Sequence, residues 1–284
     1  MKLALLAIIA SSSLVLFPAF GGQSPAPADS NVPAAEPNNT SEKDFFPRKI
    51  VTGPKAWAVA CSAVLVENNH GWHDTLATEL PSPLSIQSQK KLLKDWWGIE
   101  SKADLLESLD RLESGGHRKL FERIGWQVHN RSFLSFFLSY QITADKEASN
   151  KLLMAYCYYP AVGEKSLIGW DFARAIYLCR VSYECGYISE DEAWEHIMSY
   201  AVYLQQTFDS WEDLGKNYII GRKFWSYGET LKSGEDIDDA FMVLTEMTSS
   251  PWNTLPWNMN LGQDNENHEN LFPKPVIVSS DLVK

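Results

Sequence analysis

The sequence has little positive charge and no cluster of it. Its 284 residues include 25 Lys and Arg against 36 Asp and Glu, which gives a formal net charge of −11 at pH 7. Binding of nucleic acid depends on a basic surface that faces the phosphates, and no stretch of this chain gathers Lys and Arg into one. Nucleic acid is therefore not expected as a partner.

Common catalytic motifs are missing as well. The chain contains no G-x-S-x-G nucleophile elbow, no P-loop, no H-E-x-x-H zinc motif and no dinucleotide-binding fingerprint. His70, His73 and Asp74 share one polar loop, but two histidines in a glycine-containing turn are weak support for a site that needs at least three convergent ligands. The sequence thus predicts neither a metal nor a cofactor. Whether the protein is an enzyme stays undecided, although the missing motifs favour a protein without catalytic activity.

Cysteines are few: Cys61, Cys157, Cys179 and Cys185. Cys179 and Cys185 cannot pair if both are helical, because six residues rise about 9 Å along a helix and a disulfide joins Cα atoms at most about 7 Å apart. All four lie in apolar stretches, which favours buried free thiols, while one disulfide between more distant cysteines stays open.

The N-terminal apolar run is too short to span a bilayer. It extends from Leu3 to Phe17, interrupted by three serines, and is short of the roughly 20 residues that a membrane span needs. Lys2 before it, and Pro18 with small residues after it, are typical of a secretory signal peptide over residues 1–21, cleaved after Gly21. A periplasmic or secreted protein is expected, and the alternative is an anchor in the membrane by an uncleaved N-terminal segment.

Three further segments differ in composition. Residues 22–44 are rich in Pro, Ala and Asn, have hardly any large apolar side chains and are expected to form a disordered lead-in. Residues 45–250 carry helical apolar periodicity and should form one helical domain. Residues 251–284 lose this periodicity and are expected to form an irregular C-terminal tail.

Large apolar side chains are plentiful within the helical part. The chain has 45% hydrophobic residues, with 11 Trp, 11 Tyr and 13 Phe, which is ample for a core. The sequence predicts an all-α fold, a single orthogonal-type bundle of about eight helices. Besides the three helices described next and one that begins at His117, the expected helices are 54–66, 84–97, one capped by Ser101 and ended by Gly115, 133–141, 151–159 before Pro160, and 236–248.

Three consecutive helices are delimited most clearly. Residues 170–185 are apolar on almost all sides and end at Gly186, which is typical of a buried core helix. Ser189 with Glu192 predicts a capping box for the next helix, and Ser210 with Asp213 repeats the signal. The short connection between the second and third helices favours an antiparallel hairpin.

Charged residues fall on the apolar faces of these helices. At about 100° per residue, Asp171 and Arg174 lie on the same side of the core helix as Trp170, and Arg222 lies on the Tyr218 face of its own helix. A buried guanidinium group needs a carboxylate, carbonyl groups or a bound anion. An internal ion-pair network is favoured over an anion pocket or a catalytic site, and its candidate acids are Asp171, Glu192, Glu195 and Asp213.

His117 begins the helix that follows Gly116. The dipole at a helix N-terminus lowers the pKa of a histidine, so a neutral base is conceivable there. No nucleophile of suitable context lies near it in the sequence, which favours a capping or packing role.

The same residues resemble a bacterial family known only as domain of unknown function 1266. The similarity lies in W-D-x-x-R at Trp170, in G-Y-I-S-E-x-E-A-W at Gly186, and in the run from Leu204 to Trp225 that contains N-Y-x-x-G-R-x-F-W, with W-G-I at Trp97 and G-H-R at Gly116 farther upstream. It covers roughly residues 92–225. The resemblance implies no activity and no catalytic residues.

Two functional hypotheses follow. The first is an exported module that binds a protein or envelope partner, because a complete helical framework carries no catalytic motif. The alternative is an enzyme or small-anion binder that uses a buried cluster of Asp171, Arg174, Arg222, Glu192, Glu195 and His117. Arg174 and Arg222 are expected to lie close together, whether the cluster is structural or forms a site. If it is structural, each arginine should be bonded to a carboxylate.

Overall fold

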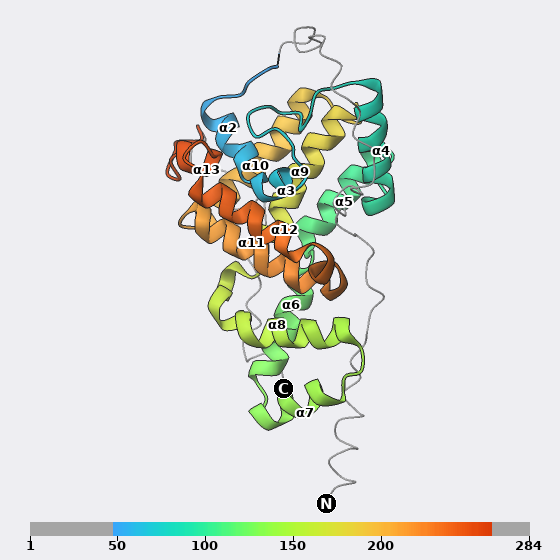
Figure 1. The fold of residues 1–284 in the computed structure, drawn as a ribbon, viewed down its shortest axis with the longest axis vertical. Helices are drawn as coiled ribbons and strands as arrows, with labels where there is room; N and C mark the ends of the chain where they lie inside the picture. Colours follow the sequence, from blue (N-terminus) through green and yellow to red (C-terminus); the bar gives the residue numbers. More distant parts are fainter. Residues whose placement is uncertain (1–47, 263–284) are drawn as a thin grey trace, which may run out of the picture.

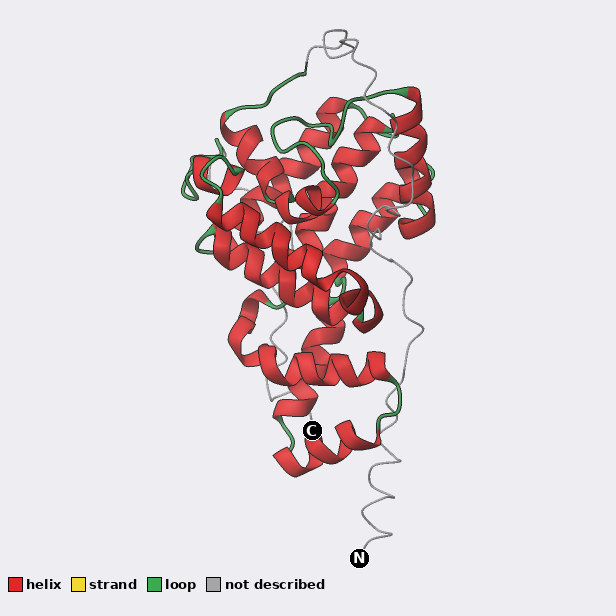
Figure 2. Ribbon diagram, in the orientation of Figure 1, coloured by secondary structure: helices red, strands yellow, loops and turns green. Residues whose placement is uncertain are grey.

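A computed structural model describes residues 48–262, and within them it contains helices and no β-strand (Figures 1 and 2). The predicted signal peptide, the predicted lead-in over residues 22–44, the first three residues of the expected helical domain and the chain after residue 262 lie outside the described residues. The expected all-α fold is confirmed. Its elements are α2 (Gly53–Ala60), α3 (Ala63–Asn68), α4 (Pro83–Trp97), α5 (Lys102–Ser114), α6 (Arg118–His129), α7 (Phe133–Ile142), α8 (Lys146–Val162), η2 (Gly163–Lys165), α9 (Ile168–Glu184), α10 (Glu190–Thr207), α11 (Trp211–Trp225), α12 (Tyr227–Glu246) and α13 (Pro251–Thr254).

Helix α9 is the core of the molecule, as predicted. Its residues from Ile168 to Ser182 are all buried, and α3, α4, α5, α10 and α11 pack around it (Figure 1). Gly186 follows its C-terminus at φ 73°, a left-handed conformation that costs glycine no steric penalty. None of the described helices is long and apolar enough to cross a membrane.

The helix starts follow the serine caps. The Ser189 hydroxyl accepts from the Glu192 backbone N–H, and the Glu192 carboxylate accepts from the Ser189 N–H, so the capping box is confirmed. Ser210 caps α11 through the Asp213 N–H. The predicted hairpin is wrong, because α10 and α11 each pack against α9 and hardly contact each other.

Two predicted helices have different bounds. The expected helix 54–66 breaks into α2 and α3 at Ser62, whose buried hydroxyl donates to the Val59 carbonyl oxygen and accepts from Arg180, 3.0 Å away. The expected helix 151–159 is longer, and Pro160 lies inside α8. Pro160 has no backbone N–H, so the carbonyl oxygen of Tyr156, four residues earlier, lacks its helical donor. His129 Nε2 lies 3.0 Å from this oxygen and takes the place of that donor.

The C-terminal region is more ordered than its sequence indicates. Helix α12 begins well before the expected residue 236 and kinks at Ser233, which has non-helical φ/ψ. Past the boundary expected at residue 250, α13 follows and Trp252 is buried in the core. The segment after residue 250 contacts α2. The Trp252 indole N–H donates to the Ala60 carbonyl oxygen, and the Trp57 indole N–H donates to the Trp257 carbonyl oxygen.

The cysteines are free thiols. Cys61, Cys179 and Cys185 are buried as expected, whereas Cys157 is exposed. The expectation of burial fails for Cys157 because α8 packs at the edge of the body, and much of this apolar helix remains open to solvent.

Candidate functional site

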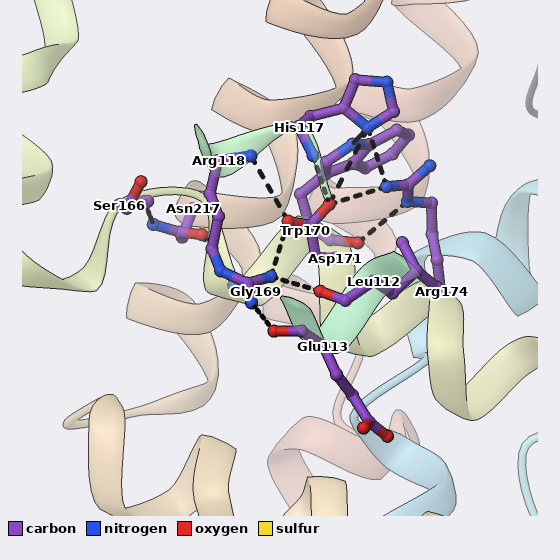
Figure 3. Close-up of polar contacts among 10 residues, drawn as sticks. All are labelled: Leu112, Glu113, His117, Arg118, Ser166, Gly169, Trp170, Asp171, Arg174 and Asn217. Carbon is purple, nitrogen blue, oxygen red and sulfur yellow. Dashed lines mark hydrogen bonds and ion pairs between the residues drawn. The ribbon is translucent and has the colours of Figure 1, made fainter. Parts of the chain in front are cut away.

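The polar centre of the molecule is Asp171, in the first turn of α9 (Figure 3). Its carboxylate is fully buried and accepts from the backbone N–H groups of His117, at 3.2 Å, and Arg118, at 3.4 Å. It also accepts from Arg174 Nη2 at 2.8 Å and from Arg118 Nη1 at 3.1 Å. Gly116 permits this approach, because a Cβ there would lie 2.1 Å from the carboxylate oxygen.

Asp171 is ionised at neutral pH. Burial by itself would raise its pKa, but the hydrogen bond with His117 and the positive charges of Arg174 and Arg118 outweigh that and lower the pKa to about 2. Its surroundings are also fixed from α11, where Asn217 accepts from the Gly169 N–H and donates to the Ser166 carbonyl oxygen (Figure 3). The N-terminus of α9 is therefore held rigidly.

Arg174 is fully buried and only partly satisfied. Its Nε donates to the Trp170 carbonyl oxygen, and its Nη2 donates to Asp171 and lies 3.0 Å from His117 Nδ1. Its guanidinium carbon lies 4.1 Å from the centre of the Trp170 ring and 5.2 Å from that of Trp97. Its Nη1 is buried without a protein partner. Burial lowers the pKa of Arg174, and the charge of Asp171 counteracts this.

His117 accepts rather than donates through Nδ1. The two groups within hydrogen-bond distance of that atom are donors, Arg174 Nη2 and the Trp170 indole N–H at 3.4 Å, while the Asp171 carboxylate lies farther away, at 3.8 Å. This arrangement favours the neutral imidazole with its proton on Nε2. Burial lowers its pKa, in the direction expected at a helix N-terminus. Its side chain is 21% exposed and makes no helix-capping hydrogen bond. His117 thus packs on the network and orients Arg174.

Arg222 lacks the carboxylate partner expected for it. The side chain is buried, its Nη2 donates to the Ser233 hydroxyl at 2.9 Å, and its guanidinium carbon lies 4.8 Å from the centre of the Trp225 ring. Its Nη1 has no protein partner. Burial lowers its pKa, which the charge of Glu229 opposes, but Glu229 makes its ion pair with Lys232 instead.

The other predicted acids lie outside the cluster. Glu192 serves the α10 cap and pairs with Lys102, Glu195 is exposed, and Asp213 pairs with Lys165. The buried stripe of α10 runs through Ala193 and Ile197, which turns both glutamates of that helix away from α9. Their assignment to the cluster is wrong.

Four buried donors without protein acceptors belong to residues that contact Trp170 directly or through Arg174 or Trp225, and we call them the donor cluster: Arg174 Nη1, Arg222 Nη1, the Tyr218 hydroxyl and Trp97 Nε1. The Tyr218 ring packs edge-on against Trp170 with centroids 5.0 Å apart, and Trp225 lies 6.2 Å from Trp170. The charges of both arginines act on the pKa of Tyr218, and that of Arg222 lowers the pKa of Arg174. The two arginines thus lie near enough for their charges to interact, as the expected proximity requires.

Sequence patterns missed part of this site and a third buried arginine. Trp97 and Tyr218 look like core aromatics in the sequence, and only their unpartnered polar atoms distinguish them. Arg180 is fully buried in α9 and donates to the carbonyl oxygens of Leu76, Trp72 and Thr75, so it fixes the loop over residues 69–82. The sequence around Arg180 does not predict these partners, because the loop lies about a hundred residues away along the chain.

Metal ligands do not converge in the described part of the chain, where no group of three or more His, Cys, Asp or Glu residues is placed to hold an ion. His73, considered above as a ligand, bonds through Nε2 to Glu67 Oε2 at 2.6 Å. A small cavity of about 50 Å³ lies beside this loop and is lined in part by His70, Thr78 and Tyr177, away from the donor cluster.

Comparison with known proteins gives a family match. The model of a family described as protein of unknown function (DUF1266) matches residues 92–257, more than half of the chain. The matched region contains Asp171, Arg174 and Arg222, and it extends beyond the 92–225 expected above to include Trp252. No curated protein and no solved structure matches the chain.

Proposed function

This chain belongs to the DUF1266 family of proteins of unknown function, and on that premise we propose that it binds a small oxyanion at the donor cluster. The observation that carries the proposal is the set of four buried donors without acceptors, two of them on guanidinium groups. A buried donor left unpaired costs about 1–3 kcal/mol, and more when it is charged. An anion that accepts from several of them removes that cost.

Local charge supports an anion rather than a neutral ligand. The network contains three arginines, Arg118, Arg174 and Arg222, and Asp171 is the one acid bonded to any of them. Planar guanidinium groups donate pairs of parallel hydrogen bonds, which match the oxygen geometry of carboxylate, sulfate and phosphate. Trp97 and Trp225, two of the aromatic rings beside the cluster, each retain 8% exposure.

Two substitutions separate binding from folding. Tyr218→Phe removes a buried hydroxyl that has no protein partner, so the unliganded protein should be equally stable or more stable. Arg222→Gln removes a guanidinium group that pairs with no carboxylate, and it leaves the Asp171 network intact. Lys216→Gln, on the exposed face of α11, is the matched control.

The test is a thermal-shift titration with acetate, sulfate and phosphate at constant ionic strength. At 100 times its Kd an anion adds about 2.7 kcal/mol of apparent stability, so at least one of the three should raise the Tm of the native chain and of the Lys216→Gln control. The shift should be smaller for Tyr218→Phe and absent for Arg222→Gln. A flat response to all three anions, or equal shifts in all variants, contradicts the proposal.

The hypothesis of a module that binds a protein or envelope partner concerns the surface and not this buried cluster. It remains a proposal beside anion binding, and export of the protein is a further expectation that fractionation of the producing cell would test.

A further inference from the structure

The small cavity lies where the loop over residues 69–82 meets α3, α4 and α9. Its volume is about 50 Å³, and its lining includes Val66 of α3, Thr78 and Glu79 of the loop, Gln89 of α4 and Tyr177 of α9. The loop wall is fixed from α9, because Arg180 donates to loop carbonyl oxygens and the Glu184 carboxylate accepts from the Thr78 backbone N–H. The protein therefore forms this cavity without help from a ligand.

Two side chains of the lining have buried polar atoms without a protein partner. Gln89 Nε2 donates to Glu79 Oε1 at 2.7 Å, which fixes the orientation of the amide and leaves Gln89 Oε1 as an unpaired acceptor. Thr78 is only 2% exposed, and its Oγ1 makes no hydrogen bond of ordinary geometry. Buried polar atoms without a partner are rare in folded proteins, so the occupant of this cavity should donate hydrogen bonds.

The charge of the lining favours a cation. Glu79 is the one carboxylate of the lining, which contains no Lys or Arg, and it forms no ion pair within the part of the chain that the structure describes. The cations on the two neighbouring helices are engaged elsewhere: Arg180 donates to loop carbonyl oxygens, and Lys90 lies 5.5 Å from the centre of the Tyr187 ring. An oxyanion would meet a carboxylate here and no free cationic donor.

The size of the cavity and its ligand set favour an ammonium group over a metal ion. One water-sized group needs roughly 10–15 Å³ of such space, so about four non-hydrogen atoms fit. Among the described residues no three His, Cys, Asp or Glu are placed to hold a metal ion. An ammonium group has three donors and needs no second carboxylate, since amide and hydroxyl oxygens such as those of Gln89, Thr78 and Tyr177 accept from it equally.

We propose that this cavity binds a small primary amine as its ammonium ion, with Glu79 as the counter-charge and Gln89 Oε1 and Thr78 Oγ1 as acceptors. The cavity shares no residue with the donor cluster, and the inference does not depend on anion binding there. Ethanolamine, with its four non-hydrogen atoms, is the probe of matching size. A ligand this small binds weakly, with an expected Kd on the order of 1 mM.

The test is a titration of the full chain with ethanolamine hydrochloride at constant ionic strength, followed by amide NMR. The signals of Gly71 and Thr78 should shift and saturate, because both residues line the cavity. Glu79→Gln should raise the Kd at least about tenfold, since it removes the counter-charge and keeps an acceptor for Gln89 Nε2. Gln89→Leu removes the unpaired acceptor and should weaken binding as well.

Matched controls are Glu107→Gln on α5 and Gln87→Leu on α4, both at exposed positions, and they should leave the Kd unchanged. Tetramethylammonium has the same charge as ethanolamine but no N–H donor, so it should shift neither signal. Potassium should need a concentration at least about tenfold higher to produce the same shift.

Three outcomes would overturn the proposal. A spectrum that never saturates with ethanolamine would mean that the cavity holds only water. Equal Kd values for Glu79→Gln and Glu107→Gln would remove the counter-charge from the argument. Binding of tetramethylammonium or potassium as tight as that of ethanolamine would show that the cavity recognises charge alone and not an amine.

Discussion

At the scale of single residues, Asp171 gathers four hydrogen-bond donors from two helices around one carboxylate. Breaking a buried ion pair from one side is costly because the remaining charge stays in a poorly solvating environment. The cost of removing a buried charge therefore depends on the partner that stays behind. Removing Arg174 leaves a buried carboxylate, Asp171, with one cation fewer, whereas removing Arg222 leaves only the Ser233 hydroxyl.

Arg174→Ala should lower the free energy of unfolding by roughly 3 to 5 kcal/mol, because it removes a partner of buried Asp171 and the cation over Trp170. The value should fall near the lower end, since Arg118 and two backbone N–H groups still bind the carboxylate. Urea denaturation measures it. Arg222→Met is the control and should cost clearly less, as it strands no carboxylate; equal losses would show that the ion pair is unimportant.

The pKa of Asp171 makes stability depend on pH in a defined window. Its pKa is lowered from the ordinary 3.8 to about 2 in the folded chain, so its stabilising contribution is complete above about pH 4 and is lost as the pH falls through 2. That contribution is on the order of 2 kcal/mol. Denaturation from pH 7 to pH 2 should therefore show the gap between the native chain and Asp171→Asn closing below pH 4.

Glu184 changes stability with pH in the opposite sense. Burial raises its pKa from 4.5 to about 7, so its contribution is most favourable below pH 4.5 and is lost as the pH rises through 7. The comparison with Asp171→Asn cancels this effect, because both proteins keep Glu184. A gap that stays constant down to pH 2 would contradict the lowered pKa of Asp171.

At the scale of elements, Arg180 joins α9 to a loop without regular structure. Three carbonyl oxygens of the loop over residues 69–82 converge on its guanidinium group, and Ser62 at the break between α2 and α3 binds its Nη1. A lysine has the charge but cannot present the same planar set of donors.

Arg180→Lys should cost about 3 kcal/mol, because several buried carbonyl groups lose a charged donor. Amide hydrogen exchange should accelerate in residues 69–82 before it does in α10 or α11, since the loop depends on this side chain. Arg123→Lys, an exposed change on α6, should leave exchange unaffected. Uniform acceleration across all helices would mean that Arg180 supports the core as a whole and not the loop.

At the scale of the whole molecule, four tryptophans close the chain on itself. The rings of Trp57, Trp211, Trp252 and Trp257 pack at centroid distances of 4.6 to 6.1 Å, and each indole N–H donates to a carbonyl oxygen on another segment. The segment after residue 250 thereby completes a core that begins with α2.

A chain that ends at residue 250 should fail to fold cooperatively, whereas one that ends at residue 262 should keep the native thermal transition. Trp252→Ala should by itself cost about 3 to 5 kcal/mol, the usual loss for a large buried aromatic. Circular dichroism melting of the three proteins measures both effects. A cooperative transition in the shorter chain would show that the tryptophan cluster is dispensable.

The sequence alone determined the features that depend on neighbours along the chain. Ser189 and Ser210 cap their helices through residues three positions on, Gly186 ends α9, and the apolar run of α9 predicts its burial, because these interactions need only local backbone geometry. The presence of Asp171 and Arg174 on one buried face followed from helical periodicity for the same reason.

Only the tertiary structure decided which partners the buried charges have. Asp171 accepts a hydrogen bond from Arg118, which lies 53 residues away in the sequence, and Arg180 donates to carbonyl oxygens of the loop. Arg222 has no carboxylate partner, because the side chain that α12 places beside it is Ser233. Trp252 is a core residue and Trp257 packs against the core because α2 and α11 provide the surface that they cover. These pairings depend on how helices pack, and a one-dimensional pattern does not contain the distance between segments that are far apart in the chain.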